Sequence, residues 1–491
     1  MTDETPQVPI PPDEVDRPAI GVDEWVASAE ERHERRGGLG GLISRGWDVS
    51  PPPAKLIVFV ALASTLPFWM NEGELFSYGL YTLIFALLAL GLNVVVGFAG
   101  LLDLGYVAFY GIGAYGYALL SSRHYGIHWQ AEFSIPIVVA GTALVGLLLG
   151  LTSRRLLGDY LAIVTLFFGQ AFVAFVNNAN PKVAGEGLTG GPNGIPGVDP
   201  LNFFGLKLHS TKQYYFLLLI VFSLAMAGLY FLSHSRTGRA WKALREDPLA
   251  AETMSIPVNR LKIMAFMFGA GTAGLAGCIF AAIQTGVVAG NFDVALLITL
   301  YAIVILGGLG SIAGVLVGAI VINVSLQFLA PSNDHPELKR WLFYGVIVLI
   351  LARIRPWARL AVVAVGTVAF GFVFHAVAGA IDSSWTAGTA MDAGSAGGGI
   401  EHWVVIPQGH PGFDTWAYII LVALIVATAR VRGWWRYGLL IPTLYWVAVV
   451  WENVLVEQPA VTALILFGAL LIALMQARPQ GLLGTARVEI V

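Results

Sequence analysis

The stretch VALLITLYAIVILGGLGSIAGVLVGAIVINVSLQFLA, residues 294–330, decides how this chain folds. It is 37 residues long, so as a single helix it would extend about 55 Å, whereas the hydrocarbon core of a membrane is about 30 Å thick. The stretch must therefore turn. Gly307, Gly308 and Gly310 with Ser311 mark the turn, because glycine interrupts helices. We predict two segments here, the first short enough to be a half-span.

The composition of the whole chain points to the same environment. Of 491 residues, 57% are hydrophobic and 12% charged, against roughly a quarter charged in soluble domains. This excludes a soluble enzyme and indicates a polytopic membrane protein. The formal net charge is −3, so no basic field suggests a nucleic-acid partner. The single cysteine, Cys278, permits no disulfide within the chain.

Further apolar runs follow the same pattern along the chain. They lie at 54–70, 76–97, 101–122, 133–152, 160–177, 213–233, 263–288, 341–354, 360–380, 415–430, 437–451 and 459–477. With the two segments of 294–330 they make fourteen candidate spans. We therefore predict an all-α polytopic membrane helix bundle of about 11–14 transmembrane segments, with broken or re-entrant helices.

The distribution of basic residues predicts the orientation, because Lys and Arg accumulate on the cytoplasmic side. With alternating spans and a cytoplasmic N-terminus, only six of the 28 Lys and Arg residues fall outside. These six are Arg123, Lys182, Lys207, Lys212, Lys339 and Arg340. Both termini are therefore expected to be cytoplasmic. The run 341–354 is the weak link because it is short, and without it every later segment would be inverted.

Three regions differ in composition. Residues 1–53 are rich in proline and acidic residues and have no apolar run, which predicts a disordered cytoplasmic tail without a signal peptide. Residues 54–356 form the main transmembrane region, and 357–491 carry additional spans. Two long outer loops, 178–212 and 381–414, are rich in glycine.

Motifs for catalysis are missing from the sequence. The glycine cluster at 307–314 has no Gly-Lys-Ser/Thr, so it cannot cradle nucleotide phosphates. There is no HExxH pair and no G-x-S-x-G elbow. We predict no enzyme activity, no ATPase motif of its own and no cofactor or metal.

Polar residues inside apolar runs are candidates to line a path, because each costs free energy in hydrocarbon. Asp103 lies between Gly100 and Gly105, which suggests a broken helix, although it could instead cap the helix that follows. The other path candidates are Asn93, Tyr106, Gln170, Asn177 and Gln284. Hydrogen bonding between helices would explain the polar residues equally well.

The inner loop 235–262 has an ordered pattern. Asp247 and Pro248 form a helix start, and Pro257 ends the short segment that follows. Small residues, Ala250 and Ala251, lie beside Glu252. Such a helix can enter a groove on a soluble partner, whereas the alternative is a charged loop that merely satisfies the positive-inside bias.

The chain resembles the LivM-type permeases of ATP-binding-cassette (ABC) importers for branched-chain amino acids, which are related to permeases of amide and urea importers. The matching pieces occur in family order: Leu90-Gly-Leu-Asn-Val-Val-Val-Gly, Gly100-Leu-Leu-Asp-Leu-Gly-Tyr, Gly111-Ile-Gly-Ala-Tyr, Gly158-Asp-Tyr-Leu-Ala-Ile-Val-Thr-Leu, Thr189-Gly-Gly-Pro-Asn-Gly-Ile, the loop 235–262 and Gly307-Gly-Leu-Gly-Ser.

This resemblance implies a role for the inner loop and a set of partners. The loop would be the coupling helix that docks on the ATPase, with Arg245, Asp247, Ala250, Ala251, Glu252, Ser255 and Pro257 as its site residues. It also implies a second homologous permease subunit, two cytoplasmic ATPase subunits and an extracytoplasmic solute-binding protein, with the chain surrounded by lipid in the inner membrane.

The chain departs from the family pattern in three places. Ser255 stands where the family usually has Gly, and Gln170 where it usually has Glu. Two segments resemble the family's end, Tyr344–Pro356 and Arg478–Gly484, so the spans between them are either an insertion or a duplicated tail.

A second class of function remains open from the residues alone. A stand-alone secondary transporter or channel would use Asp103 to carry protons or ions. Co-purification of an ATPase with the chain discriminates the two classes.

Overall fold

The computed structural model describes residues 52–153, 158–178, 182–183, 186–328, 343–345, 347–348, 357–389, 397–409, 412–431, 433–455, 468 and 481–483. The predicted tail 1–53 lies outside these residues except for its last two positions. Of the apolar run 341–354 only residues 343–345 and 347–348 are described, and of 459–477 only residue 468.

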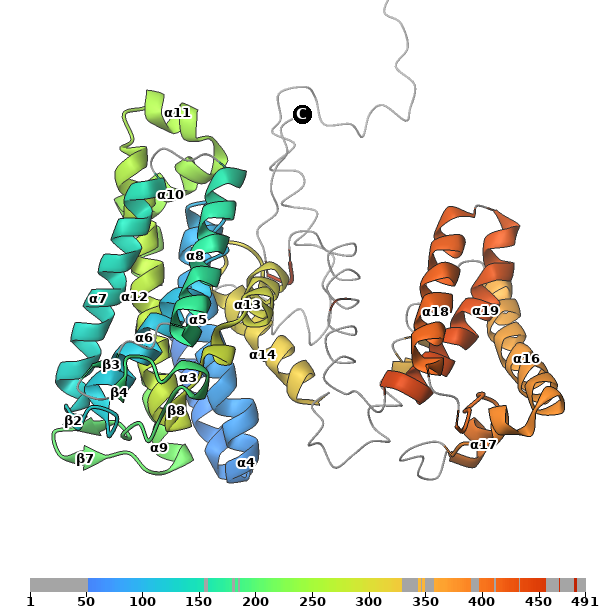
Figure 1. Cartoon of the computed structure of the whole chain (residues 1–491). Coiled ribbons are helices and arrows are strands. Elements are labelled where there is room, and N and C mark those ends of the chain that lie inside the picture. Colours follow the sequence, from blue (N-terminus) through green and yellow to red (C-terminus); the bar gives the residue numbers. More distant parts are fainter. Residues whose placement is uncertain are drawn as a thin grey trace, which may run out of the picture. The chain divides into compact units, whose positions relative to one another are not determined.

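Helices dominate the described residues (Figure 1). The first group comprises α3 (Pro52–Trp69), α4 (Glu72–Glu74), η2 (Leu75–Leu80), α5 (Tyr81–Leu92), η3 (Asn93–Phe98), α6 (Tyr106–Leu120), α7 (Ala131–Ser153), α8 (Asp159–Asn178), α9 (Thr211–His234), α10 (Arg236–Glu246), α11 (Pro248–Thr253) and α12 (Val258–Gln284). The second comprises η5 (Ala289–Phe292), α13 (Val294–Gly307), α14 (Ile312–Phe328), α16 (Trp357–Ile381), η6 (Ser383–Thr386), α17 (Gly397–Glu401), α18 (Phe413–Arg430), α19 (Trp434–Val450) and η8 (Trp451–Leu455).

The strands are two residues long and pair antiparallel. They are β1 (Ser121–Ser122) with β2 (Ile127–His128), β3 (Lys182–Val183) with β4 (Glu186–Gly187), β5 (Ile195–Pro196) with β8 (Gly286–Val287), and β6 (Asn202–Phe203) with β7 (Leu206–Lys207). A short 3-10 turn, η4 (Gly191–Asn193), precedes β5. These strands order the glycine-rich loop 178–212 and tie it to the end of α12 through the β5–β8 pair, whose Ile195 faces Val287.

Seven helices within the described residues are long and apolar enough to cross a membrane, and four shorter apolar helices accompany them. This confirms the prediction of an all-α polytopic bundle. The chain divides into two units between Thr65 and Leu66, a boundary that falls inside α3. The remaining paragraphs concern residues from Leu66 onward.

The centre of the main bundle is the crossing of α12 with α6 (Figure 1). Small residues allow this crossing. A Cβ on Gly277 would lie 2.2 Å from the carbonyl oxygen of Tyr110, and one on Gly113 would lie 2.3 Å from that of Gly274. Small residues at such spacing let helix backbones approach closely in membranes. α5 and α7 pack on the same central helix α12.

The two ends of the main bundle differ. At one end lie the short strands of the loops, and at the other lie α10 and α11 (Figure 1). α12 connects them, since it begins just after α11 and ends at β8.

The predicted turn within residues 294–330 is confirmed. α13 ends at Gly307 and α14 begins at Ile312. Between them, Gly308 and Gly310 have φ angles of 111° and 81°, in a region that favours glycine. The two helices pack against each other after the turn, and their 14 and 17 residues correspond to about 21 and 26 Å, less than a full membrane crossing.

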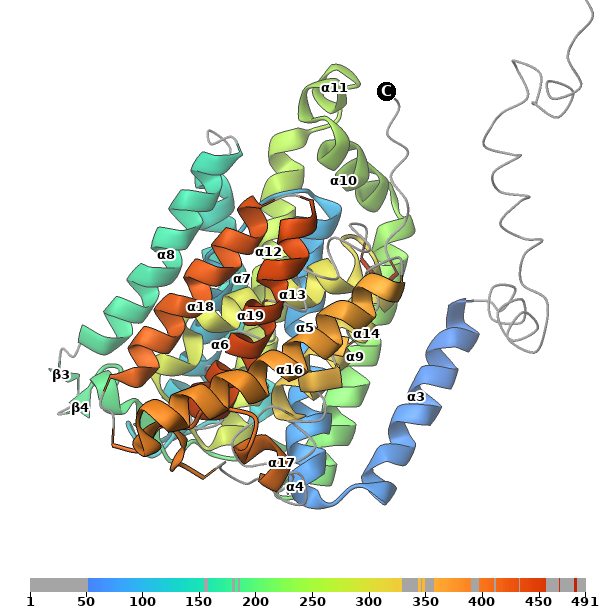
Figure 2. The ribbon, with the colours of Figure 1, turned by 90° about the vertical axis from the view of Figure 1, so that its right-hand side faces the viewer.

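Beyond residue 356, the helices α16, α18 and α19 pack against one another (Figure 2). α19 packs against both α16 and α18. Their core is aromatic: the rings of Phe343 and Trp451 stack with centroids 3.7 Å apart, and Tyr445 is surrounded by Phe370, Phe374 and Trp403.

Candidate functional site

The first element of the candidate site is a break between α5 and α6. The α5 helix continues as the π-helix η3, which ends at Phe98, and α6 starts only at Tyr106. Gly105 allows this break to lie against α8, because a Cβ there would stand 2.2 Å from the carbonyl oxygen of Thr165. The backbone N–H of Leu104 donates to the Thr165 hydroxyl at 2.9 Å. The break is therefore fixed on α8.

Asp103 lies inside this break and is fully buried. Its Oδ1 accepts a hydrogen bond from the Gly105 N–H at 3.0 Å, whereas its buried Oδ2 has no hydrogen-bond partner among the described residues. The Tyr301 hydroxyl of α13 donates to the Asp103 carbonyl oxygen at 2.7 Å and is 3.1 Å from its backbone nitrogen, which donates to it. Burying a carboxylate oxygen without a hydrogen-bond donor costs free energy.

The capping alternative for Asp103 accounts for only one of its oxygens. The hydrogen bond to Gly105 is the two-residue turn that Asp commonly makes. The cap position of α6 is Gly105 itself, and no side chain bonds to that cap.

The second break, between α13 and α14, is bonded by Asn93 to the start of η3, the helical segment that leads into the first break. The Asn93 Oδ1 accepts from the Gly310 N–H at 2.9 Å, and its Nδ2 donates to the Ser311 carbonyl oxygen at 3.4 Å. Asn93 is completely buried. One amide side chain at the start of η3 thus satisfies two backbone groups of the second break, and its bond to Gly310 spans 217 residues of sequence.

The remaining path candidates do not join this cluster. Tyr106 is buried and its hydroxyl donates to the Leu88 carbonyl oxygen at 2.9 Å, which is a contact between helices. Gln284 donates to the Tyr81 hydroxyl, at the opposite end of α5 from Asn93, about 18 Å along the helix axis. On α8, Gln170 is exposed and Asn177 half-buried.

Tyr301 and Thr165 complete the site and were missed by sequence reasoning. Both are hydroxyl residues with apolar sequence neighbours, so composition offered a weak signal, but their partners lie 198 and 61 residues away. No local spacing rule could have paired them with the Asp103 break.

The chain's end also reaches the second break. The N–H groups of Leu482 and Leu483 donate to the carbonyl oxygens of Leu306 and Gly307 at 2.7 and 3.1 Å. These carbonyls belong to the last turn of α13, where helices leave acceptors without partners. Gly481 makes room, since a Cβ there would stand 2.6 Å from the Gly308 Cα.

The inner loop folds as two short helices with one residue between them. Asp247 ends α10 and caps α11, with its Oδ1 accepting from Leu249 and Ala250 N–H groups at 2.8 and 3.1 Å. The predicted helix start is confirmed. Ser255 follows α11 with φ of +61°, which explains physically why glycine suits that position.

The exposed face of α11 is not the one expected from its small residues. Ala251 is buried against its own chain, so the expectation that both alanine methyl groups enter a partner groove is wrong for this residue. Ala250 and Glu252 are exposed, and Leu249 and Met254 are 76% and 78% exposed. Beside Glu252, at Pro257 and along the start of α12, lies an open groove of about 530 Å³.

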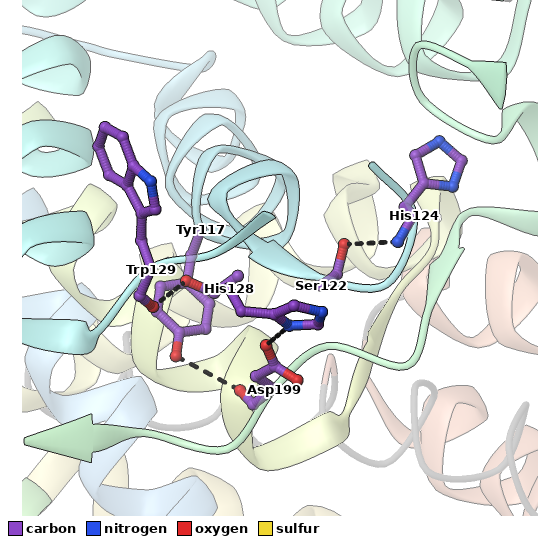
Figure 3. A network of polar contacts seen from close by, with 7 residues as sticks. Tyr117, Ser122, His124, His128, Trp129 and Asp199 are labelled. Carbon is purple, nitrogen blue, oxygen red and sulfur yellow. Dashed lines mark hydrogen bonds and ion pairs between the residues drawn. The ribbon is translucent and has the colours of Figure 1, made fainter. Parts of the chain in front are cut away.

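A polar network holds the opposite end of the bundle (Figure 3). The His128 Nδ1 lies 2.5 Å from the Asp199 Oδ2, and the Tyr117 hydroxyl donates to the Asp199 carbonyl oxygen at 3.3 Å. The Ser121 hydroxyl donates to the Trp129 carbonyl oxygen at 2.9 Å. These contacts attach the loop after α8 to the end of α6, so this network is structural.

A helix bundle with two joined helix breaks around a buried carboxylate defines a membrane transport protein. Residues 75–351 match the family described as the permease component of branched-chain amino acid transport systems, and the chain belongs to this family. The match includes both breaks and the helices α10 and α11, and it ends before α16.

Curated relatives agree with this membership. The chain is 38% identical over 321 residues to the high-affinity branched-chain amino acid transport system permease protein LivM of Escherichia coli (strain K12), covering 60% of this chain and 72% of that protein. It is 25% identical over 275 residues to BraD of Pseudomonas aeruginosa, a permease protein of the same description, covering 54% of this chain and 88% of that protein. It is also 26% identical over 280 residues to the permease protein LivH of Salmonella typhimurium, with the same coverage. No solved structure matches the chain.

Proposed function

We propose that this chain is the transmembrane permease subunit of an ATP-driven ABC importer. The observation that carries the proposal is α11, a separately capped helix at one end of the bundle with two large exposed apolar side chains, Leu249 and Met254. Apolar side chains exposed together mark a contact surface for another protein. The partner that meets this surface is a cytoplasmic ATPase subunit.

The proposed assembly contains a second homologous permease subunit, two ATPase subunits and an extracytoplasmic solute-binding protein. The relatives support the paired permeases, since LivM and LivH are both named as permease proteins of branched-chain amino acid transport systems. The permease domain comprises residues 54–356, and 357–491 add further membrane segments.

We also propose the orientation that the basic residues predict. The end with α10 and α11 is cytoplasmic, as are both termini, and the strand-bearing loops face outward across the inner membrane. The clustering of Arg236, Arg239, Lys242 and Arg245 on α10 supports this orientation.

The proposed substrates are branched-chain amino acids or similar small polar solutes. The printed functions of the relatives support this class. The joined breaks around Asn93 and Asp103 supply the polar groups that such a solute would meet on its path.

The proposal is tested by combining purification with transport. The chain is expressed with its partner genes, purified in detergent and reconstituted in liposomes, and uptake of labelled leucine is measured with and without ATP. We expect the ATPase to co-purify and uptake to require ATP. Uptake by the isolated chain without ATP contradicts the proposal.

The α11 surface is tested with a matched pair of variants. Leu249→Asp places a charge on the proposed ATPase contact, whereas Leu206→Asp changes the same residue type, also 76% exposed, at the opposite end of the bundle. Only the first should lower ATPase co-purification. Equal recovery of the ATPase with both variants argues against α11 as the contact.

A second candidate function rests on Asp103. Because its Oδ2 is buried without a partner, a stand-alone transporter could use this carboxylate to carry a proton. This candidate predicts uptake driven by a pH gradient in liposomes that contain the chain alone.

A further inference from the structure

Arg245 contacts both helix breaks from the helix that precedes α11. Its Nη1 donates to the Gly97 carbonyl oxygen at the end of η3. The same nitrogen would lie 3.0 Å from a Cβ on Gly310, in the second break. The Cγ and Cα of Arg245 would lie 2.9 and 3.1 Å from a Cβ on Gly100, in the first break. One side chain thus fills the space between the two breaks.

The positive charge of the Arg245 guanidinium is favourable beside the Gly97 carbonyl oxygen. Gly97 is in the last turn of a helical segment, where carbonyl groups lack partners within the helix and carry partial negative charge. A cation that donates a hydrogen bond there satisfies the carbonyl and interacts favourably with the helix end. Arg supplies several donors in a planar group, whereas Lys supplies a compact charge.

Only two residues, Glu246 and Asp247, separate Arg245 from the first residue of α11. Arg245 lies one residue before the end of α10, and Asp247 alone separates α10 from α11. α10 is itself held on the bundle, because Trp241 is buried and its Nε1 donates to the Leu261 carbonyl oxygen at 3.0 Å. A displacement of α11 must therefore move α10 and, with it, the side chain of Arg245.

We propose that Arg245 is the positioning residue through which α11 moves both helix breaks, and with them the backbone around Asp103 and Asn93. This inference rests on the proposed function, because it assigns a partner's movement as the cause of displacement. The two breaks respond together, since Asn93 bonds Gly310 in the second break to η3, which leads into the first.

The test measures coupling rather than activity alone. The full complex is reconstituted in liposomes with wild-type chain, Arg245→Ala, Arg245→Lys and Lys242→Ala, and ATP hydrolysis and solute uptake are measured in parallel. Lys242 is an exposed cation on the same helix and serves as the matched control. We expect Arg245→Ala to hydrolyse ATP while the solute taken up per ATP falls about tenfold. Arg245→Lys should restore part of this ratio, and Lys242→Ala should retain it.

Several outcomes overturn the inference. An unchanged ratio in Arg245→Ala does so, and so does a proportional fall of hydrolysis and uptake, which is the result of a merely structural role. Where Arg245→Ala does not assemble, Arg245→Lys decides, because it keeps the stem against Gly100, and a wild-type ratio in that variant overturns the need for the guanidinium. Failure of the proposed function is separate: the wild-type chain then shows no ATP-dependent uptake at all.

Discussion

The main bundle and the helices beyond residue 356 are packed by different means. In the main bundle, small residues bring backbones together, and 83% of the residues in an 18-residue apolar window of Glu72–Phe98 are buried. Beyond residue 356, aromatic rings fill the interior, and 11% of the residues in the corresponding window of Arg359–Ile381 are buried. Close backbone contact fixes the distance and angle between two helices, whereas packed aromatic rings hold helices together without bringing their backbones into contact. The close backbone contacts of the main bundle lie within the family match, whereas α16, α18 and α19 lie beyond it.

The largest effect on the stability of the main bundle is expected at the α6–α12 crossing. Gly277→Ala places a methyl group 2.2 Å from the backbone oxygen of Tyr110, which cannot move aside as a side chain could. Overpacking typically costs about 1–3 kcal/mol, and a backbone clash belongs at the upper end. Thermal unfolding in detergent should show strong destabilisation. Gly271→Ala on the same helix meets only ordinary contacts at 3.8 Å and should unfold like the wild type.

A loss of uptake without loss of folding is expected at Asp103. Asp103→Leu removes the acceptor of the buried Gly105 N–H, at a cost of about 1–3 kcal/mol, and removes the polar group of the break. The variant should insert into the membrane and fail to take up solute. Asp103→Asn keeps an acceptor oxygen and should be milder. Full uptake by Asp103→Leu would show that Asp103 only forms a local turn and that transport does not need its carboxylate.

An intermediate effect is expected at the chain's end. Gly481 has a φ of +80°, so Gly481→Ala introduces about 1–2 kcal/mol of backbone strain. The added methyl group also clashes with the backbone of Gly308. The Leu306 and Gly307 carbonyls then lose their donors, so uptake should fall in part. Protease access at the terminus should rise. Leu483→Ala keeps the backbone donor and should behave as the wild type in both assays.

A local effect is expected among the later helices. Trp451→Ala removes a ring stacked on Phe343, and such truncations in cores cost about 3–5 kcal/mol. Limited proteolysis should show loosening of α16–α19, with uptake nearly unchanged. A collapse of uptake comparable to that of Gly277→Ala shows instead that the two regions form one cooperative unit.

The smallest effect is expected at the opposite end of the bundle. The His128–Asp199 pair is partly exposed, at 53% and 34% of the two side chains, and exposed pairs contribute about 0–1 kcal/mol. Asp199→Asn should leave uptake unchanged and shift the unfolding temperature little, and the shift should vanish at high salt. A large loss of stability assigns the network a greater structural role than its exposure suggests.

Local signals in the sequence were reliable where local chemistry determines structure. The glycine turn at 307–311 and the Asp247–Pro248 helix start depend on backbone preferences and caps, and both are confirmed. The helical bundle follows from hydropathy alone.

The rest of the site depends on contacts that no local rule predicts. The pairing of Tyr301 with Asp103 and of Asn93 with Gly310 requires the packed bundle. The burial of Ala251 has the same origin, because a small residue suits the inside of a short helix as well as its outer face. Helical spacing alone did not distinguish these two faces.

The contact of Leu482 and Leu483 with α13 sets an order of events during synthesis. The acceptors at Leu306 and Gly307 leave the ribosome roughly 170 residues before their donors. At about 5–20 residues per second, the end of α13 waits about 10–35 s for its partner, while the later helices are still being made. The helix break near the middle of the sequence is therefore completed only after the later helices have been made, and the bundle stays unfinished until then.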